Sequence, residues 1–278
     1  MGMKRFVSVL AALGLACAST IVMAQENEWS KLPWQLGPIT AHLGDEATLR
    51  VSDGYKFLDV RGTRRFNELA ENPSDGSDEY TLSGNGWVAF FSYGEVGYVK
   101  DDDTIDPDTI LSNIRKGTAE ANLERRKRGW GEMSILGWNT PPEYDSQLKT
   151  LTWSILGENT NDHQKVVNYN ARLLGRHGVM SVVLVTEPEK LASAIRDFKK
   201  QVQGFQYVVG ETYGEYQPGD HVAAYGLAAL ITGGAAAVAA KKGLFSVIGG
   251  FLIAAWKFAL AGIVAVGAWL KSLFTKKR

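Results

Sequence analysis

The alternation of hydrophobic and polar residues in the middle of the chain predicts a series of short strands. Apolar residues recur at every second position, the period of a strand with one buried face, and glycine, proline and asparagine separate the runs. The predicted strands are 39–43, 47–51, 55–59, 86–93, 96–100, 133–139, 148–156, 165–173, 178–186 and 205–209, with a loop at 73–86 and a turn at 140–142. The short connections predict antiparallel pairing, including a hairpin about Gly94-Glu95 and a meander over 133–186.

Three other segments have the 3.6-residue period of an amphipathic helix. One covers residues 63–71. A second begins at Pro107, with Asp106 as its N-cap. A third begins at Thr186, where Glu189 three residues later completes the pattern of a capping box. We therefore predict an α+β fold, a mainly antiparallel sheet with two or three helices packed against one face.

Residues 1–24 have the pattern of a secretory signal peptide. Lys4 and Arg5 precede an apolar run that is too short to span a bilayer comfortably, and small residues lead up to Ala24. We predict cleavage after Ala24, the alternatives being an uncleaved membrane anchor and a lipid attached at Cys17. Because Cys17 is the only cysteine, the cleaved chain has no disulfide and no cysteine nucleophile.

From Val222 onward the composition is that of a membrane segment. Residues 222–240 hold no charged side chain, and residues 244–270 are apolar except for Lys257. A bilayer span takes about 20 apolar residues, so both runs have a suitable length. We therefore predict a C-terminal transmembrane anchor, 222–278, of one or two apolar helices with a basic tail. The positive-inside rule favours a cytoplasmic tail and a single crossing, while a helical hairpin stays the alternative.

Charge divides the chain in the same way. All 30 acidic residues lie within 25–221, so this part is negatively charged, whereas both ends are basic. An acidic domain argues against sequence-independent binding of nucleic acid. We predict a periplasmic domain at 25–221, at the bacterial inner membrane and facing the periplasm or cell exterior. The predicted partners are the lipid bilayer, through 222–270, and an envelope protein.

The sequence contains no motif that defines a reaction. It has no G-x-S-x-G elbow, P-loop, H-E-x-x-H or C-x-x-C. The acidic run 101–108 lacks the pattern of a calcium loop, because Ile105 stands at a ligand position and no glycine follows it. We therefore predict no cofactor and no metal, and we assign no catalytic residue.

Aromatic and charged residues beside predicted turns give a candidate binding surface. Aromatic side chains at strand ends can line ligand clefts and protein contacts, the alternative being an ordinary sheet core. The candidate binding residues are Tyr98, Lys100, Asp101, Asp102, Trp138 and Tyr144.

Three segments together resemble an uncharacterised bacterial family. They are GYVKDDDTIDPDTIL (97–111), VNYNARLLGRHGVMSVVLV (167–185) and AAYGLAALITGGAAAVAAKKGL (223–244). The resemblance extends from about Trp34 into the second apolar run. It implies a membrane-anchored bacterial protein with a domain of unknown function, and it implies no reaction, cofactor or catalytic residue.

Three hypotheses of function follow. The first is a non-enzymatic binding or scaffolding module that recruits an envelope partner. The second is an envelope hydrolase that uses a carboxylate pair, for which Glu143 and Asp145 are candidates. The third is a membrane protein whose Gly- and Ala-rich segment assembles helices under the control of the domain.

Overall fold

The computed structural model describes residues 28–70, 77–127 and 131–232 of a chain that divides into two units, Met1–Pro33 and Trp34–Arg278. In the first unit the described residues form a helical turn, in which the Lys31 N–H donates to the Glu28 carbonyl (3.1 Å). The predicted signal peptide, with Cys17, lies outside the described residues. The sheets, helices and clusters below all belong to the second unit.

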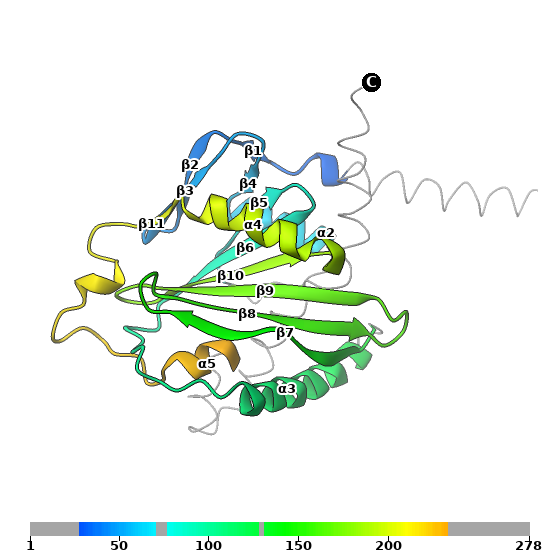
Figure 1. Cartoon of the computed structure of the whole chain (residues 1–278). Coiled ribbons are helices and arrows are strands. Elements are labelled where there is room, and N and C mark those ends of the chain that lie inside the picture. Colours follow the sequence, from blue (N-terminus) through cyan, green and yellow to red (C-terminus); the bar gives the residue numbers. More distant parts are fainter. Residues whose placement is uncertain (1–27, 71–76, 128–130, 233–278) are drawn as a thin grey trace, which may run out of the picture. The chain divides into compact units, whose positions relative to one another are not determined.

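Two antiparallel sheets form the frame of the second unit (Figure 1). Their strands are β1 (Gln35–Leu36), β2 (Ile39–Leu43), β3 (Ala47–Val51), β4 (Lys56–Leu58), β5 (Glu79–Gly84), β6 (Trp87–Gly94), β7 (Met133–Asp145), β8 (Thr150–Asn159), β9 (Lys165–Leu174), β10 (Val179–Thr186) and β11 (Phe205–Tyr207). The larger sheet has eight strands in the order β1-β4-β5-β6-β10-β9-β8-β7, and the smaller has three in the order β11-β3-β2. Every strand pair in both sheets is antiparallel, which confirms the predicted α+β class.

The predicted meander is present as β7 to β10, and β2 and β3 have the predicted bounds. Two predictions nearby are wrong. The predicted loop 73–86 contains β5, whose Tyr80 and Leu82 are buried. Residues 96–100 form no hairpin with β6, because β5 and β10 occupy both edges of that strand.

The predicted turn at Thr140-Pro141-Pro142 is also wrong, since β7 continues through it to Asp145. β7 is an edge strand, and its pairing with β8 shifts register between Ile135 and Gly137 and twice more before Glu143. Proline is tolerated on an edge strand and at bulges, where its missing N–H costs no ladder hydrogen bond.

Four helices with described bounds pack on the sheets: α2 (Val60–Leu69), α3 (Pro107–Lys127), α4 (Leu191–Val202) and α5 (Leu227–Thr232). The predicted cap of α3 is confirmed, because the Asp106 carboxylate accepts hydrogen bonds from the Asp108 and Thr109 N–H groups (3.1 and 3.2 Å). The predicted capping box at Thr186 is wrong. Its hydroxyl donates to the Gly86 carbonyl (2.9 Å), and a short 3₁₀ helix, η1 (Pro188–Lys190), leads into α4.

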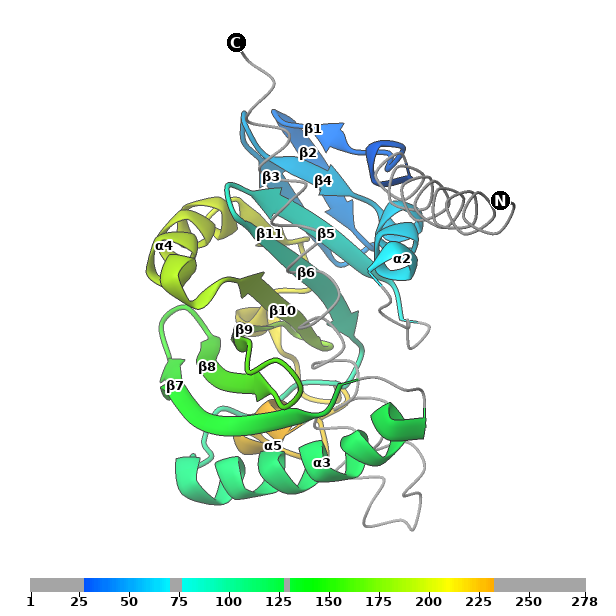
Figure 2. The same cartoon turned by 90° about the vertical axis from the view of Figure 1, so that its right-hand side faces the viewer.

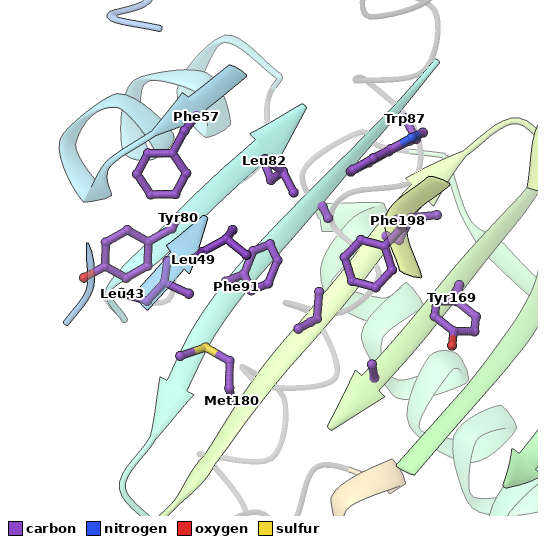
Figure 3. Close-up of a cluster of buried hydrophobic side chains, with 14 of the residues drawn as sticks. Leu43, Leu49, Phe57, Tyr80, Leu82, Trp87, Phe91, Tyr169, Met180 and Phe198 are labelled. Carbon is purple, nitrogen blue, oxygen red and sulfur yellow. The ribbon is translucent and has the colours of Figure 1, made fainter. Parts of the chain in front are cut away.

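The first core cluster fills the space between one face of the larger sheet, the smaller sheet and α4 (Figure 3). Its largest members are Leu43, Leu49, Phe57, Tyr80, Leu82, Trp87, Phe91, Tyr169, Met180 and Phe198. The Phe198 ring of α4 lies edge-on to Trp87, with centroids 5.8 Å apart. This cluster fixes the smaller sheet and α4 on the larger sheet.

The second core cluster lies on the opposite face. Its members include Val99, Ile110, Ile114, Met133, Ile135, Leu151, Trp153, Ile155, Tyr213, Leu227, Leu230 and Ile231, from α3, α5, β7, β8 and two loops. Tyr169 of the first cluster pairs with Ser154, whose neighbour Trp153 belongs to the second cluster. Because successive side chains of a strand point to opposite faces, the two clusters lie on opposite sides of the sheet.

The prediction that the helices pack against one face is therefore wrong. α2 also lies on the second face, where Thr63 and Thr81 share a hydrogen bond (2.9 Å). Figure 2 shows α2 and α4 on opposite sides of β5 and β6. Both faces of the central strands carry buried side chains, and each needs its own cover.

Residues 222–232, which open the predicted anchor, are packed with the domain. Val222 forms a parallel bridge with Tyr98, and α5 buries Leu227, Leu230 and Ile231 in the second core cluster. The remainder of the predicted anchor, including the run 244–270, lies outside the described residues. Among the helices of the described part, none has the length and apolar character needed to cross a membrane.

Candidate functional site

Asp101 is the centre of a cluster that joins two distant parts of the chain. Its Oδ2 accepts hydrogen bonds from the Tyr144 hydroxyl (2.7 Å) and the Lys149 ammonium (2.9 Å). Burial opposes ionisation of the carboxyl, but the hydrogen bonds from Lys149 and Tyr144 outweigh it and hold the pKa of Asp101 below its ordinary value. Burial and the bond to Asp101 raise the pKa of Tyr144, so this hydroxyl keeps its proton. The ionised carboxylate fastens the loop after Val99 to the turn between β7 and β8.

Three tyrosine rings stack beside this cluster. Tyr98 lies between Tyr213 and Tyr216, with ring centroids 4.4 and 4.3 Å away. Tyr213 is buried and donates its hydroxyl proton to the Val99 carbonyl (2.9 Å), and the Lys149 ammonium lies 5.1 Å from the centre of its ring. Tyr216 is 38% exposed. We call Tyr98, Tyr213 and Tyr216 the tyrosine stack; it is buried at Tyr213 and exposed at Tyr216.

The backbone connects the tyrosine stack directly to the segment that opens the predicted anchor. The Tyr98 N–H donates to the His221 carbonyl (2.8 Å), and the Ala223 N–H donates to the Tyr98 carbonyl (2.9 Å). Gly97 makes this approach possible. Its φ is +87°, and an added Cβ would lie 2.6 Å from the His221 carbonyl oxygen.

The structure brings only part of the predicted binding set together. Tyr98, Asp101 and Tyr144 belong to the cluster and stack just described. Lys100 and Asp102 are exposed on the same loop. Trp138 has another role, because its indole N–H donates to the Pro107 carbonyl at the start of α3 (3.2 Å). Whether the six residues bind a ligand stays a prediction.

Sequence reasoning missed a second polar cluster, at the turn between β9 and β10. Arg176 binds Asp220 through two parallel hydrogen bonds, Nε to Oδ2 at 2.7 Å and Nη2 to Oδ1 at 2.9 Å. His177 Nδ1 lies 2.9 Å from both carboxylate oxygens of Glu211. The partners are 44 and 34 residues apart, so no local pattern in the sequence indicates the pairing. The cluster ties the loop after β11 to the end of the sheet.

The Arg176–Asp220 pair predicts a specific loss of stability in acid. The hydrogen bonds from Arg176 lower the pKa of Asp220 to about 2, from an ordinary value of 3.8. The stabilisation is therefore complete above pH 3.8 and is lost as the pH falls towards 2. Urea unfolding of the full chain between pH 5 and pH 2 measures this slope, which should become shallower in Asp220→Asn. An unchanged slope in that variant would contradict the assignment.

Four further carboxylates, Glu132, Glu143, Asp145 and Glu158, each have a local partner or face solvent. Glu132 pairs with Arg126 (2.6 Å), and Glu158 pairs with His163 (2.5 Å). Asp145 accepts the N–H groups of the β7–β8 turn, and Glu143 is exposed. Within the described residues no group of three or more His, Cys, Asp or Glu side chains is arranged to hold a metal ion.

These features define a two-sheet α+β domain with a tyrosine-lined surface fastened by partly buried ion pairs. The chain belongs to the family described as protein of unknown function (DUF2167), whose model matches residues 35–267. This confirms the resemblance to an uncharacterised family, while the membrane anchoring that the resemblance implies stays a prediction.

The other comparisons add little. One solved structure with some likeness is the solution structure of cyanobacterial PsbP (CyanoP) from Synechocystis sp. PCC 6803. It is 10% identical, the match covers 63% of this chain and 93% of that chain, and the TM-score is 0.36. A likeness of this size supports no conclusion about function. A comparison with curated proteins finds no match.

Proposed function

We propose that this protein is a non-enzymatic binding module of the bacterial envelope, which holds a protein partner close to the inner membrane. The observation that carries the proposal is the backbone pairing of Tyr98 with Val222 and Ala223. It joins the tyrosine stack to the segment that leads into the predicted anchor. A partner bound at the stack is then held next to the bilayer.

The chemistry of the stack suits recognition of a protein. Tyrosine is enriched among the residues that dominate binding energy, because its ring buries a large area at little cost in side-chain entropy. Tyr216 is partly exposed at one end of the stack, and Tyr213 is buried at the other. Lys100 and Asp102 are exposed near it and supply charges of both signs for a polar rim.

The arrangement of acids favours a binding role over a hydrolase. Asp101 is engaged by Lys149 and Tyr144, so its carboxylate is not poised as a general base. Of the two residues considered as a hydrolytic pair, Asp145 closes a turn and Glu143 faces solvent. These roles are structural or solvated, and they support the proposal without excluding other chemistry.

A photo-crosslinking experiment on the full chain tests the proposal. A photoreactive phenylalanine analogue replaces Tyr216 or, as a matched control, Val209, which is 95% exposed on the same loop region. Membranes are washed with alkaline carbonate before irradiation, so that only firmly held protein is analysed. We expect one adduct with an envelope protein from position 216 and none from position 209.

Binding of the captured partner to the purified full chain gives the quantitative measure. Truncation of an exposed aromatic anchor costs about 2 kcal/mol or more, so Tyr216→Ala should weaken binding by about thirtyfold, while Val209→Ala leaves it unchanged. Equal effects of the two variants would refute a role for the tyrosine stack. Loss of the chain in the carbonate wash would refute the membrane location.

A further inference from the structure

The second face of β9 is polar along its middle, although it is buried. Asn168, Asn170 and Arg172 alternate there with Tyr169 and other residues of the first core cluster. The exposed fractions of the three polar residues are 4%, 5% and 7%. In sequence, such an alternation is typical of a strand with one solvent face. Here that face lies against the interior.

Arg172 lies over an aromatic ring on this face. The Cζ of its guanidinium lies 4.8 Å from the centre of the Trp153 ring, on β8. Its cross-strand neighbours are Leu151 on β8 and Ser181 on β10. One N–H of the guanidinium donates to the Ala171 carbonyl (3.0 Å).

No carboxylate in the described part of the chain pairs with Arg172. A guanidinium has five N–H donors, and a buried charge without a partner is strongly unfavourable. Burial lowers the pKa of Arg172 to about 10, so the side chain still carries its charge at neutral pH. The charge of Arg176, four residues along the chain, is by contrast compensated by a carboxylate, since Asp220 binds it through two hydrogen bonds.

We propose that Arg172 is the anchor of a small-ligand site and binds an oxyanion, a carboxylate or phosphate group, beside Trp153. The planar fork of a guanidinium matches two oxygens of such a group, and stacking on an indole leaves the N–H edges free to donate. The low local dielectric of a buried site strengthens such a contact.

The neighbouring side chains supply further contacts for such a ligand. Ser181 stands directly opposite Arg172, and Asn170 is the next residue of β9 on the same face, so both can donate hydrogen bonds to the anion. Tyr225 lies near enough that the charge on Arg172 lowers its pKa against the larger rise caused by burial. Tyr225 is half-buried and offers aromatic surface to the body of the ligand, whereas Trp153 is buried beneath the guanidinium. This site is separate from the tyrosine stack and does not depend on the proposed function.

Thermal unfolding of the full chain in detergent tests the site. The midpoint is followed by tryptophan fluorescence while sodium phosphate or sodium acetate replaces sodium chloride at constant ionic strength. We expect at least one oxyanion to raise the midpoint in a saturable way, since a ligand that binds only the folded state stabilises it. A short-chain phosphatidic acid added to the micelle distinguishes a lipid headgroup from a free anion. If the site binds a lipid headgroup, the phosphatidic acid gives the same shift of the midpoint at a lower concentration than phosphate does.

Two variants of Arg172 and one control variant test whether the rise of the midpoint depends on this side chain. Arg172→Met keeps an unbranched side chain over Trp153 and should weaken the apparent affinity at least tenfold, without lowering the midpoint in chloride alone. Arg172→Lys keeps the charge but not the fork, and should also bind at least tenfold more weakly. Arg115→Met is the control, because Arg115 donates only to the Ile135 and Leu136 carbonyls in the described chain and should keep the full shift.

Three results would overturn the inference. The first is the absence of any saturable shift in the unmodified chain. The second is a shift of equal size in Arg172→Met or, should that variant not fold, in Arg172→Lys. The third is a lower midpoint of Arg172→Met in chloride, which would make Arg172 a structural cation.

Discussion

Phe198→Ala is expected to lower the free energy of unfolding by about 3–5 kcal/mol, as removal of a fully buried aromatic ring does in other cores. Phe198 is 2% exposed, and its ring lies near those of Trp87, Phe91 and Tyr169, with centroids 5.8, 6.3 and 6.4 Å away. The cavity would open where α4 meets the larger sheet. Since domains of this kind are stable by about 5–15 kcal/mol, the variant should be close to unfolding.

Urea denaturation of the full chain in detergent, followed by tryptophan fluorescence, measures this change. Phe198→Leu keeps most of the volume and should cost less, about 1.5 kcal/mol. Val209→Ala alters a side chain that is 95% exposed and should change stability by less than about 0.5 kcal/mol. A loss below about 1 kcal/mol for Phe198→Ala would mean that α4 does not depend on this ring.

Gly97→Ala should destabilise the protein by about 2–5 kcal/mol and loosen the connection between the tyrosine stack and residues 221–223. A left-handed conformation costs alanine about 1–2 kcal/mol, and crowding adds about 1–3 kcal/mol. The added Cβ would lie 2.5 Å from His221 Nδ1 and 2.6 Å from its carbonyl oxygen. The amide protons of Tyr98 and Ala223 should then exchange faster with solvent.

Gly54→Ala separates the cost of the left-handed backbone conformation from the cost of crowding against His221. Gly54 has nearly the same φ, +84°, but no atom lies within 4 Å of an added Cβ. It should therefore show the conformational cost alone, about 1–2 kcal/mol, with unchanged exchange at Tyr98 and Ala223. Equal losses in the two variants would show that the contact with His221 is unimportant.

Local chemistry made much of the fold predictable. The start of α3 follows from Asp106 and Pro107, whose effects act within one helical turn. β5 could not be predicted in this way, because the serines, threonine and glycine around Tyr80 and Leu82 also suit a loop. The capping box at Thr186 failed because a carbonyl 100 residues away, that of Gly86, takes its hydroxyl. Such competition is set by tertiary structure.

The candidate site was predictable only in part for the same reason. Asp101 and Tyr144 were chosen as polar and aromatic residues near turns, and they are hydrogen-bonded over 43 positions. Lys149 completes the cluster from a turn, and Tyr213 supports the stack from a 3₁₀ helix of only three residues, Tyr213–Glu215, so neither carries a periodic signal. Arg172 follows a polar alternation that normally marks solvent, and only the fold shows that it is buried.

The two borders of the larger sheet limit how a partner can dock. β1 has only two residues, Gln35 and Leu36, and β7 carries Pro141 and Pro142 among its three register shifts. Neither border offers a long, regular row of unpaired main-chain donors and acceptors, so a foreign peptide finds no template to extend the sheet. In the proposed binding role, recognition at the larger sheet therefore depends on side chains, and point substitutions should alter it without disturbing the scaffold.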